Sequence, residues 1–555
     1  MEASPDSGRM QLVALVLLAA ILVSVWALRF RVTAADAAPG TTTAEIPTAV
    51  GGFPLLGNAL QYKKSPTDCI REQQDRLSSK LFRLNLAGRE MILVGADPKL
   101  MQRLASLPSS ILSARKAVAD IGFEYTLGRT NVYQGTDWHK RILKQEIVTG
   151  RQFATTFLPH TFDCLEKALN RELELMDNDN QKLVVPVADL LLLVRRCVLR
   201  TQMNSLLSPV LLQEDPGLLL HFMTFQDMIE DTTAKAAVLP RWLALPVCLW
   251  PTQAARHKLV QRLTPLIQLA WKKYQKASET AKSVAQSSVR IIGPWLHTYL
   301  SEQIPPEEAA ELCIGLLFAA HKNPSIGAAQ CFCFYHSELT AEQQSQARIE
   351  ALHICKHFRS NKNTRGESNA SSPSSVKVLV EATTLRACVL ETMRMTAHTI
   401  GAVRYAEQPV QVEVQTAKAR NNDDGEPTTT TTAYCIRKGE TVAMAHHAMH
   451  METRLWGANA EKFDVSRWKT VPQSSDSIDL PVDRYKLTTF SNGVHQCPGA
   501  SIALAMMEMA LALLLVRDTQ LKGELPPLDF ERATLAQRHG PVPVRIKKRD
   551  YATST

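Results

Sequence analysis

The chain has 555 residues, 45% hydrophobic and 21% charged, which is enough for a large core in one big domain or two ordinary ones. Its net charge of +9 is dispersed rather than gathered into aromatic-interleaved basic patches, which argues against nucleic-acid binding and suits an anionic lipid or an acidic protein partner. The 11 cysteines show no CxxC spacing, so we expect free thiols in a reducing compartment rather than a disulfide framework or a zinc site.

The first expected element is an apolar stretch over residues 12–28, which with its flanks is long enough to span a bilayer. Arg29 and Arg31 outnumber Arg9 on the other side, which predicts a single-pass anchor with the bulk of the chain in the cytosol. The alternative is a cleavable signal peptide, with small residues for cleavage at positions 34–38.

A polar linker rich in threonine, glycine and proline follows over residues 41–54. Prolines stiffen the exit from an anchor and set the angle of the domain behind it. We therefore predict an N-terminal anchor and linker over residues 1–45, followed by one domain over residues 46–555, because no second boundary is visible.

The rest of the chain predicts a mostly α fold with a small β part. Residues 81–86 and 91–94 alternate well enough for a strand pair, and helical patterns dominate from there to about residue 360. The polar segments 359–375 and 416–432 are expected to be solvated loops, the second with a run of five threonines.

A helix is predicted around Glu391 and Arg394, because Leu385, Val389 and Met393 form an apolar stripe four residues apart. Glu391 and Arg394 are neighbours on the surface of such a helix. Taken alone, they describe an ordinary helix ion pair.

A group of histidines, His446, His447 and His450, has the spacing at which imidazoles can share a metal ion. No carboxylate lies at a known ligand spacing from them, and they follow a strand-like entry to a turn. We therefore predict no metal site here.

The most informative stretch is Phe490–Gly499, in which Cys497 lies just before an apolar helix over residues 501–516. The N-terminal end of that helix favours a thiolate over a thiol, and Gly493 and Gly499 allow close backbone approach. A buried thiolate on a tight loop is what a haem iron with an axial sulfur ligand needs. The alternative is a buried structural cysteine.

The complete pattern, Phe-x-x-Gly-x-His-x-Cys-x-Gly, resembles the haem-binding loop of the cytochrome P450 family. The resemblance implies the cytochrome P450 fold, haem b, and an iron ligated by Cys497 within a loop that includes Phe490 and Gly493. It implies O₂ and electrons from NADPH-cytochrome P450 reductase as well. Glu391 and Arg394, with Arg467 from the segment 463–468, resemble the network that locks the thiolate loop to the helical core.

The resemblance also predicts which side chains hold the haem propionates. Cations that pair with carboxylates, and one hydroxyl donor, are the residue types needed. The candidates are Arg404, His495, Arg141 or Lys144, and Tyr133. The family usually has a basic residue four positions after the tryptophan that Trp138 matches, and Ile142 stands there. The alternative for Arg141 and Lys144 is therefore a solvated basic face with no haem role.

Residues 317–325 resemble the oxygen-side helix of the family, with one departure. Asn323 stands where most relatives have a threonine that helps deliver protons, and His321 is an alternative proton source. Pro324 has no N–H, so we expect the Ala320 carbonyl to lose its helical partner and the helix to kink. We expect Asn323 and His321 to tune the chemistry toward slow or proton-independent reactions, unless the chemistry has moved to waters or been lost.

His495 and the ten-residue spacing from Arg394 to Arg404 are most similar to sterol 14α-demethylases and relatives acting on sterols, bile acids and prostanoids. The prediction is a haem-thiolate monooxygenase, anchored in the endoplasmic reticulum membrane, that oxidises a sterol or other lipophilic substrate. Two alternatives stay open. One is an isomerase or dehydratase of the same fold acting on peroxides without a reductase, and the other is a catalytically silent haem- or lipid-binding protein.

Overall fold

The computed structural model describes residues 43–54, 56–86, 88–129, 138–143, 147, 152–177, 183–239, 241–280, 291–363, 374–417, 429–468, 478, 486–530 and 534–548. Nearly all of them belong to one compact unit, Ile46–Thr555. In the described part of the chain, no helix combines the length and apolar character needed to cross a membrane. The span predicted over residues 12–28 lies outside the described residues.

Helices make up most of this unit. They are α2 Ala59–Lys64, α3 Pro66–Leu77, α4 Pro98–Ser106, α5 Ala114–Asp120, α6 Phe123–Thr126, α7 Trp138–Arg141, α8 Leu158–Met176, α9 Leu190–Gln202, α10 Val210–Glu214, α11 Leu218–Val238, α12 Arg241–Ala244, α13 Trp250–Thr280, α14 Pro294–Ser301, α15 Pro306–Glu338, α16 Ala341–Asn363, α17 Ser375–Glu381, α18 Thr383–Met395, α19 His446–His450, α20 Thr453–Trp456 and α21 Ala500–Val516.

The strands are short. They are β1 Leu81–Leu86, β2 Arg89–Val94, β3 Leu112–Ser113, β4 Val184–Val187, β5 Gly401–Ala406, β6 Val410–Ala417, β7 Thr429–Ile436, β8 Thr441–Met444, β9 Gln520–Leu521, β10 Leu528–Asp529, β11 Gln537–Arg538 and β12 Val544–Lys547. The main sheet has the order β1-β2-β8-β5-β3, in which only β2 and β8 run parallel. The predicted strand pair is therefore present as the antiparallel β1 and β2, and the mostly α class with a small β part is confirmed.

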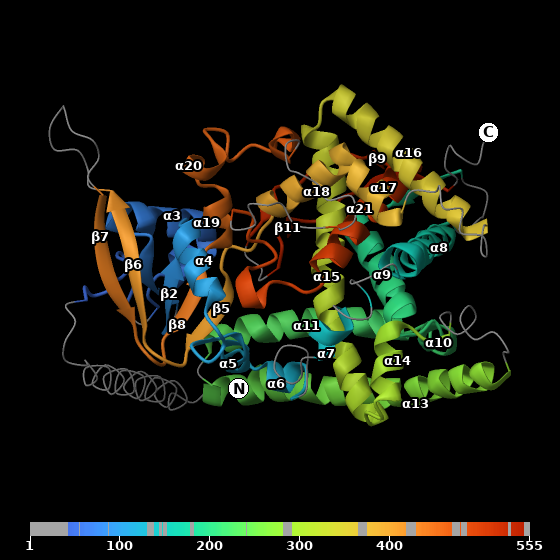
Figure 1. Ribbon diagram of the computed structural model, residues 1–555, viewed down its shortest axis with the longest axis horizontal. Coiled ribbons are helices and arrows are strands. Elements are labelled where there is room, and N and C mark those ends of the chain that lie inside the picture. Colours follow the sequence, from blue (N-terminus) through green and yellow to red (C-terminus); the bar gives the residue numbers. More distant parts are fainter. Residues whose placement is uncertain are drawn as a thin grey trace, which may run out of the picture. The chain divides into compact units, whose positions relative to one another are not determined.

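Helix α15 occupies the middle of the unit and packs on α9, α13, α18 and α21 (Figure 1). A Cβ at Gly327 of α15 would clash with the side chains of Met507 of α21 and Met393 of α18, so a larger residue there would force both methionines to shift. Helix α21 is apolar around its circumference because other helices cover it on every side. One large apolar core therefore fills the helical part, and smaller cores lie against the sheet.

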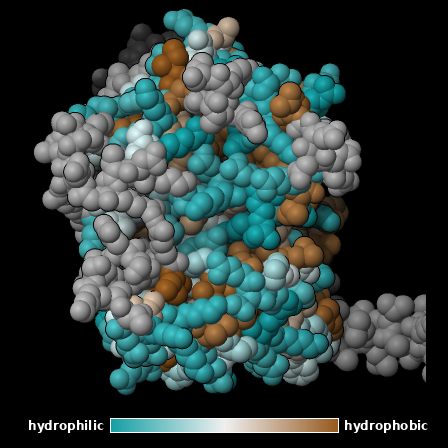
Figure 2. Space-filling model, turned by 90° about the vertical axis from the view of Figure 1, so that its right-hand side faces the viewer, coloured by the Kyte–Doolittle hydropathy of each residue, from teal (hydrophilic) through white to brown (hydrophobic). Residues whose placement is uncertain are grey.

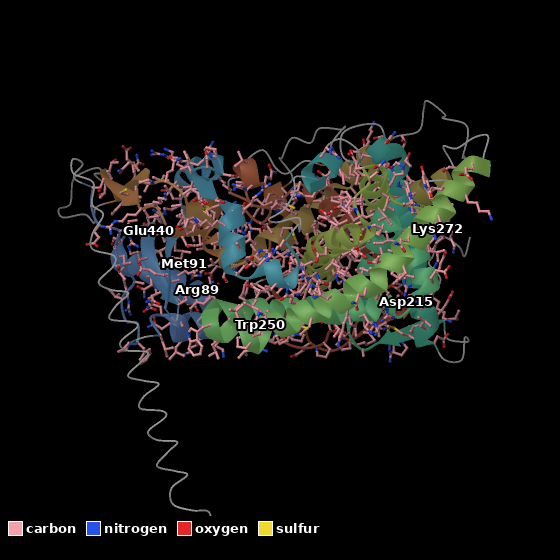
Figure 3. All side chains as sticks on the ribbon, turned by 90° about the horizontal axis from the view of Figure 1, so that it is seen from below. Arg89, Met91, Asp215, Trp250, Lys272 and Glu440 are labelled. Atoms are coloured by element: carbon pink, nitrogen blue, oxygen red, sulfur yellow. The ribbon has the colours of Figure 1, made fainter. Side chains whose placement is uncertain are left out.

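The sheet lies on one side of α15, and most of the other helices lie on the opposite side (Figure 1). Strands β2 and β5 to β8, with α3, α4 and α19, lie at one end of Figure 1, and α8, α9, α14, α16 and α17 lie at the other. In Figure 3, Arg89, Met91 and Glu440 mark the sheet end, whereas Trp250 marks the start of α13 and Lys272 its far end. The face of the helical end in Figure 2 is mostly hydrophilic, with scattered apolar spots, as expected when the apolar sides face inward.

Two predicted loops are shorter than expected. Residues 359–363 continue α16, and Thr429–Thr432 pair with residues 414–417 in the β6–β7 hairpin. Threonine is β-branched and fits a pleated strand, so the prediction of a loop was wrong for the end of the threonine run. Residues 364–373 and 418–428 lie outside the described residues.

Candidate haem-binding site

The Cys497 loop is fixed by its own backbone before any cofactor is considered. The Cys497 N–H donates to the Phe490 carbonyl at 2.8 Å, and the Ser491 N–H donates to the Thr488 carbonyl at 2.8 Å. Gly493 has a φ of +64°, and a Cβ there would come within 2.0 Å of the Ala105 carbonyl oxygen of α4. Glycine is therefore required at this position for the loop to rest on α4.

The Cys497 thiol faces an unusual environment. Its side chain is exposed, yet burial raises the pKa of the thiol, and a backbone hydrogen bond from Gly499 only partly opposes this. Burial therefore opposes the effect expected from the N-terminal end of α21, and the thiolate form of Cys497 stays a prediction.

Arg404 provides the clearest test of whether the site fits a haem. Its guanidinium lies 7% exposed on β5, donates to the Val403 carbonyl at 2.9 Å and lies 3.4 Å from Ser491 Oγ in the cysteine loop. Among the described residues no carboxylate pairs with it, and burial lowers the pKa of Arg404 to about 10. A buried cation of this kind needs an anion, and a haem propionate supplies one. The residues present therefore fit a haem at this position.

The other predicted haem contacts are placed less directly. Phe490 and His495 are half-buried members of the loop, with Phe490 packed against the main core. Arg141 pairs with Glu302 at 2.8 Å, and both side chains are exposed. Tyr133 and Lys144 lie outside the described residues. The haem roles of these five residues stay predictions.

Glu391 and Arg394 are both fully buried and form a two-pronged ion pair, with nitrogen–oxygen distances of 2.7 and 2.9 Å. The same guanidinium donates to the carbonyls of His450 at 2.7 Å, Ala460 at 2.6 Å and Lys462 at 3.0 Å. A buried arginine is stable only when its donors are used in this way.

The rest of the network comes from the segment 464–468. The Asp464 N–H and the Trp468 indole each donate to Glu391 at 2.9 Å, and Arg467 Nε lies 3.3 Å from the same carboxylate. Arg467 also donates to the Asn459 carbonyl at 2.6 Å. The structure thus brings Glu391, Arg394 and Arg467 together. Trp468 was missed in the sequence, although its place next to Arg467 could have suggested it.

The oxygen-side turn of α15 is held by neighbouring elements. The helix continues through Pro324. Pro324 has no N–H to donate to the Ala320 carbonyl, and Gln202 Nε2 of α9 donates to that carbonyl instead, at 3.5 Å. Asn323 Oδ1 accepts the N–H of Leu535 at 3.2 Å. A polar side chain on a neighbouring helix thus replaces the missing helical donor.

His321 is also engaged by protein. Its Nε2 lies 2.9 Å from the Arg195 carbonyl, so it donates there, and its Nδ1 contacts Gln226 Oε1 of α11. Burial is the main cause that lowers the pKa of His321 to about 3. The next residue, Lys322, is buried and pairs with Asp227 at 3.1 Å and with Glu230. The proton-delivery roles of His321 and Asn323 stay predictions, although both ring nitrogens of His321 and the Oδ1 of Asn323 already contact protein groups.

Comparison with known proteins identifies the class to which this fold and site belong. A family model described as "Cytochrome P450" matches residues 47–532, so the chain belongs to the cytochrome P450 family. Members of this family bind haem b through a cysteine thiolate, which confirms the predicted cofactor and the predicted enzyme class, an oxidoreductase of this family.

The similarity to individual relatives is local. Cytochrome P450 monooxygenase 128 of Postia placenta is 30% identical over 152 residues, covering 27% of this chain and 26% of the relative. Cytochrome P450 94B3 of Arabidopsis thaliana is 27% identical over 141 residues, covering 24% and 26%. Cytochrome P450 714C2 of Oryza sativa subsp. japonica is 25% identical over 211 residues, covering 38% and 33%. The matches thus span a quarter to a third of these relatives and do not single out the sterol branch.

Proposed function

We propose that this protein is a haem-thiolate monooxygenase that oxidises a lipophilic substrate with O₂ and electrons from a reductase partner. The observation that carries the proposal is the placement of Arg404, which is buried with no carboxylate partner among the described residues, 3.4 Å from Ser491 in the Cys497 loop, within a chain of the cytochrome P450 family. The haem, when bound, supplies the oxidising chemistry.

The residues of this chain would hold the haem and shape its site. Cys497 would hold the iron, Arg404 with Ser491 would hold a propionate, and the clamp would keep the segment 460–468 and the His450 carbonyl fixed against α18. Helix α15 would form the opposite wall. The buried residues of the helical core would exclude water from the reaction.

The first experiment is a reduced carbon-monoxide difference spectrum of the full-length protein. Wild type should show the red-shifted band of a thiolate-ligated haem, and Cys497→Ser should lose it. Cys435→Ser is a matched control, because Cys435 lies in β7 with no helix behind it. An unchanged band in Cys497→Ser would contradict the proposal. A second measurement, NADPH consumption and product formation with cytochrome P450 reductase, tests the electron supply.

We further propose a sterol or another flat lipid as the substrate and the endoplasmic reticulum membrane as the location. His495 and the Arg394–Arg404 spacing support the first proposal, and the apolar stretch over residues 12–28 supports the second. A spectral titration with a panel of sterols, bile acids and fatty acids tests the substrate. Microsomal fractionation with carbonate extraction tests the location, and recovery of a soluble chain trimmed near residue 38 would indicate a signal peptide instead.

A second candidate function is isomerisation or dehydration of a peroxide without a reductase. It is favoured by the oxygen-side turn, where Asn323 is bound by Leu535, and His321 by Arg195 and Gln226. A peroxide substrate already carries the O–O bond, so this reaction does not need the proton delivery that those residues would otherwise supply. Turnover of an organic hydroperoxide by wild type and by Asn323→Thr tests it. An enzyme that is well coupled with reductase, inert toward hydroperoxides and unimproved by threonine would rule it out.

A further inference from the structure

Helix α19 presents two histidines, one turn apart, to the start of the cysteine loop. His446 and His450 are 4% and 0% exposed, and both reach Thr488, which is itself fully buried. Thr488 is the first residue of the segment that leads through Phe490 and Ser491 to Cys497. Two side chains from one short helix therefore hold the entry to the loop.

The protonation of His450 follows from its partners. Its Nδ1 lies 2.9 Å from the Arg394 carbonyl, which only accepts, so Nδ1 carries the proton. Its Nε2 receives the backbone N–H of Thr488 at 2.9 Å, so that nitrogen is unprotonated. His450 is thus a neutral bridge that joins the end of α18 to Thr488. The Arg394 guanidinium also donates to the His450 carbonyl at 2.7 Å, so the same residue is tied to the clamp twice.

His446 holds the side chain of Thr488 rather than its backbone. Its Nδ1 lies 2.7 Å from Thr488 Oγ1, which in turn lies 3.3 Å from His450 Nε2. The hydroxyl completes one hydrogen bond with His446 in either direction of donation. The charged and titratable groups that influence His446 are His398, Arg404 and His450, and no carboxylate is among them.

The position of Thr488 is passed to Cys497 through backbone hydrogen bonds. The Thr488 carbonyl accepts the N–H of Ser491, and the Phe490 carbonyl accepts the N–H of Cys497, both at 2.8 Å. Thr489 Oγ1 donates to the Met393 carbonyl at 2.7 Å, which adds a second tie to α18. A displacement at Thr488 therefore moves the sulfur, because only short hydrogen-bonded turns separate the two residues.

We propose that His450 and His446 are positioning residues for the Cys497 ligand, and that they act through Thr488 to hold the sulfur where a haem iron can take it. This inference rests on the proposed haem-thiolate function and extends it to two residues whose described hydrogen bonds reach Thr488 rather than Cys497. It differs from the Glu391–Arg394 clamp, which holds the segment 460–468 and the His450 carbonyl but makes no contact with Thr488 among the described residues.

The chain offers a matched control in His447. It adjoins His446 at the start of α19, it is similarly buried, and burial lowers the pKa of both rings, to about 4 and about 3. Its ring, however, contacts Thr67 Oγ1 of α3 at 3.1 Å and packs edge-on against Phe530. Removing His447 therefore removes a buried imidazole of the same helix without touching Thr488.

The experiment uses the full-length, haem-loaded protein and follows the carbon-monoxide band after reduction. His450→Leu and His446→Leu should speed the loss of the red-shifted thiolate band at least tenfold, and should speed transfer of haem to apomyoglobin, whereas His447→Leu should stay within twofold of wild type. His450→Gln should recover part of the loss, because its carbonyl oxygen can accept the Thr488 N–H.

The hydrogen bond between His446 and the Thr488 hydroxyl is tested by separate variants, which still give a result if His450→Leu does not fold. Thr488→Val should match His446→Leu, and the double variant should be no worse than either, because both remove the same hydrogen bond. A stable thiolate band in His446→Leu and Thr488→Val would overturn the inference. A wild-type protein without the band would instead refute the haem-thiolate function itself, so the two failures are distinguishable.

Discussion

At the scale of single residues, the site depends on buried polar groups whose partners are all specified. Arg394 illustrates the rule, since one guanidinium serves a carboxylate and three carbonyls while fully buried. Arg404 illustrates the exception, because its surroundings hold no carboxylate among the described residues. A residue such as Arg394 is stabilised by groups of the protein itself, whereas a residue such as Arg404 needs an anionic ligand to be stabilised.

The clamp gives a prediction at this scale. Arg394→Ala leaves the Glu391 carboxylate buried without its strongest partner, which should cost about 3–5 kcal/mol of unfolding free energy. Urea denaturation measures the loss, and haem content should fall with it. Arg83→Ala is the control, because Arg83 also forms carboxylate ion pairs, with Glu90 and Glu440, but Glu90 is half exposed. A stable, haem-replete Arg394→Ala protein would show that the pair is no more than a local ion pair.

Glu508 gives a second prediction. It is fully buried on α21, 3.1 Å from Arg386, and burial raises the pKa of its carboxyl to about 7. Between pH ~4.5 and ~7 the unfolded chain ionises this group while the folded chain does not, so Glu508 lowers the unfolding free energy as the pH rises. Glu508→Gln should make stability rise more steeply with pH, by up to about 1.4 kcal/mol per pH unit in this window. An unchanged slope in urea titrations would show that Glu508 ionises normally.

At the scale of elements, α15 shows how a helix tolerates proline near a site. Pro324 leaves the Ala320 carbonyl without a helical donor, Gln202 of α9 donates to it instead, and the helix continues past the proline. The carbonyl that lacks a helical partner is predictable from the sequence, because it lies four residues before the proline. Gln202 is not predictable in this way, because it lies 118 residues away in the chain.

This arrangement predicts a coupling between the two positions. Gln202→Leu should destabilise the protein by about 1 kcal/mol, because it removes the donor to a partly buried carbonyl. In a Pro324→Ala background the new N–H can serve Ala320, so the same substitution should cost much less. A double-mutant cycle in urea measures the difference. Equal costs in both backgrounds would mean that Gln202 does not replace the helical hydrogen bond.

At the scale of the whole molecule, buried neutral histidines set the response to acid. Burial lowers the pKa of His321, His446, His398 and His447 to about 3 or 4, and that of His450 further. Three of the five lie on α19, so the same helix that holds the cysteine loop is sensitive to protonation. Acid should therefore disturb the loop and the global fold together.

The sign of this effect is definite. Each of these histidines stays neutral in the folded state while the unfolded chain binds a proton below pH ~6.5, so their stabilisation is complete above that pH and is lost as the pH falls toward ~4. We expect the unfolding free energy to fall steeply over this window, and His447→Gln to reduce the slope by up to about 1.4 kcal/mol per pH unit. Chemical denaturation at a series of pH values measures it. A flat profile between pH 4 and 6.5 would contradict the expectation.

The sequence by itself determined the local features of this protein. The Cys497 motif, the apolar helix behind it, the β1–β2 pair and the Glu391–Arg394 spacing are all readable because their residues are neighbours along the chain or repeat with the period of one element. The mostly helical class followed from the same periodicities. These features were sufficient to predict the family and its cofactor.

Only the tertiary structure decided which distant groups meet. It showed that His450 joins Arg394 to Thr488 by hydrogen bonds. It also showed that Gln202 donates to the Ala320 carbonyl and that the Leu535 N–H donates to Asn323 Oδ1. It further showed that burial opposes the thiolate form of Cys497, because the desolvation that raises its pKa depends on how much protein surrounds it. Hydrogen-bond pairing and burial arise from packing between elements remote in sequence, so no local pattern encodes them.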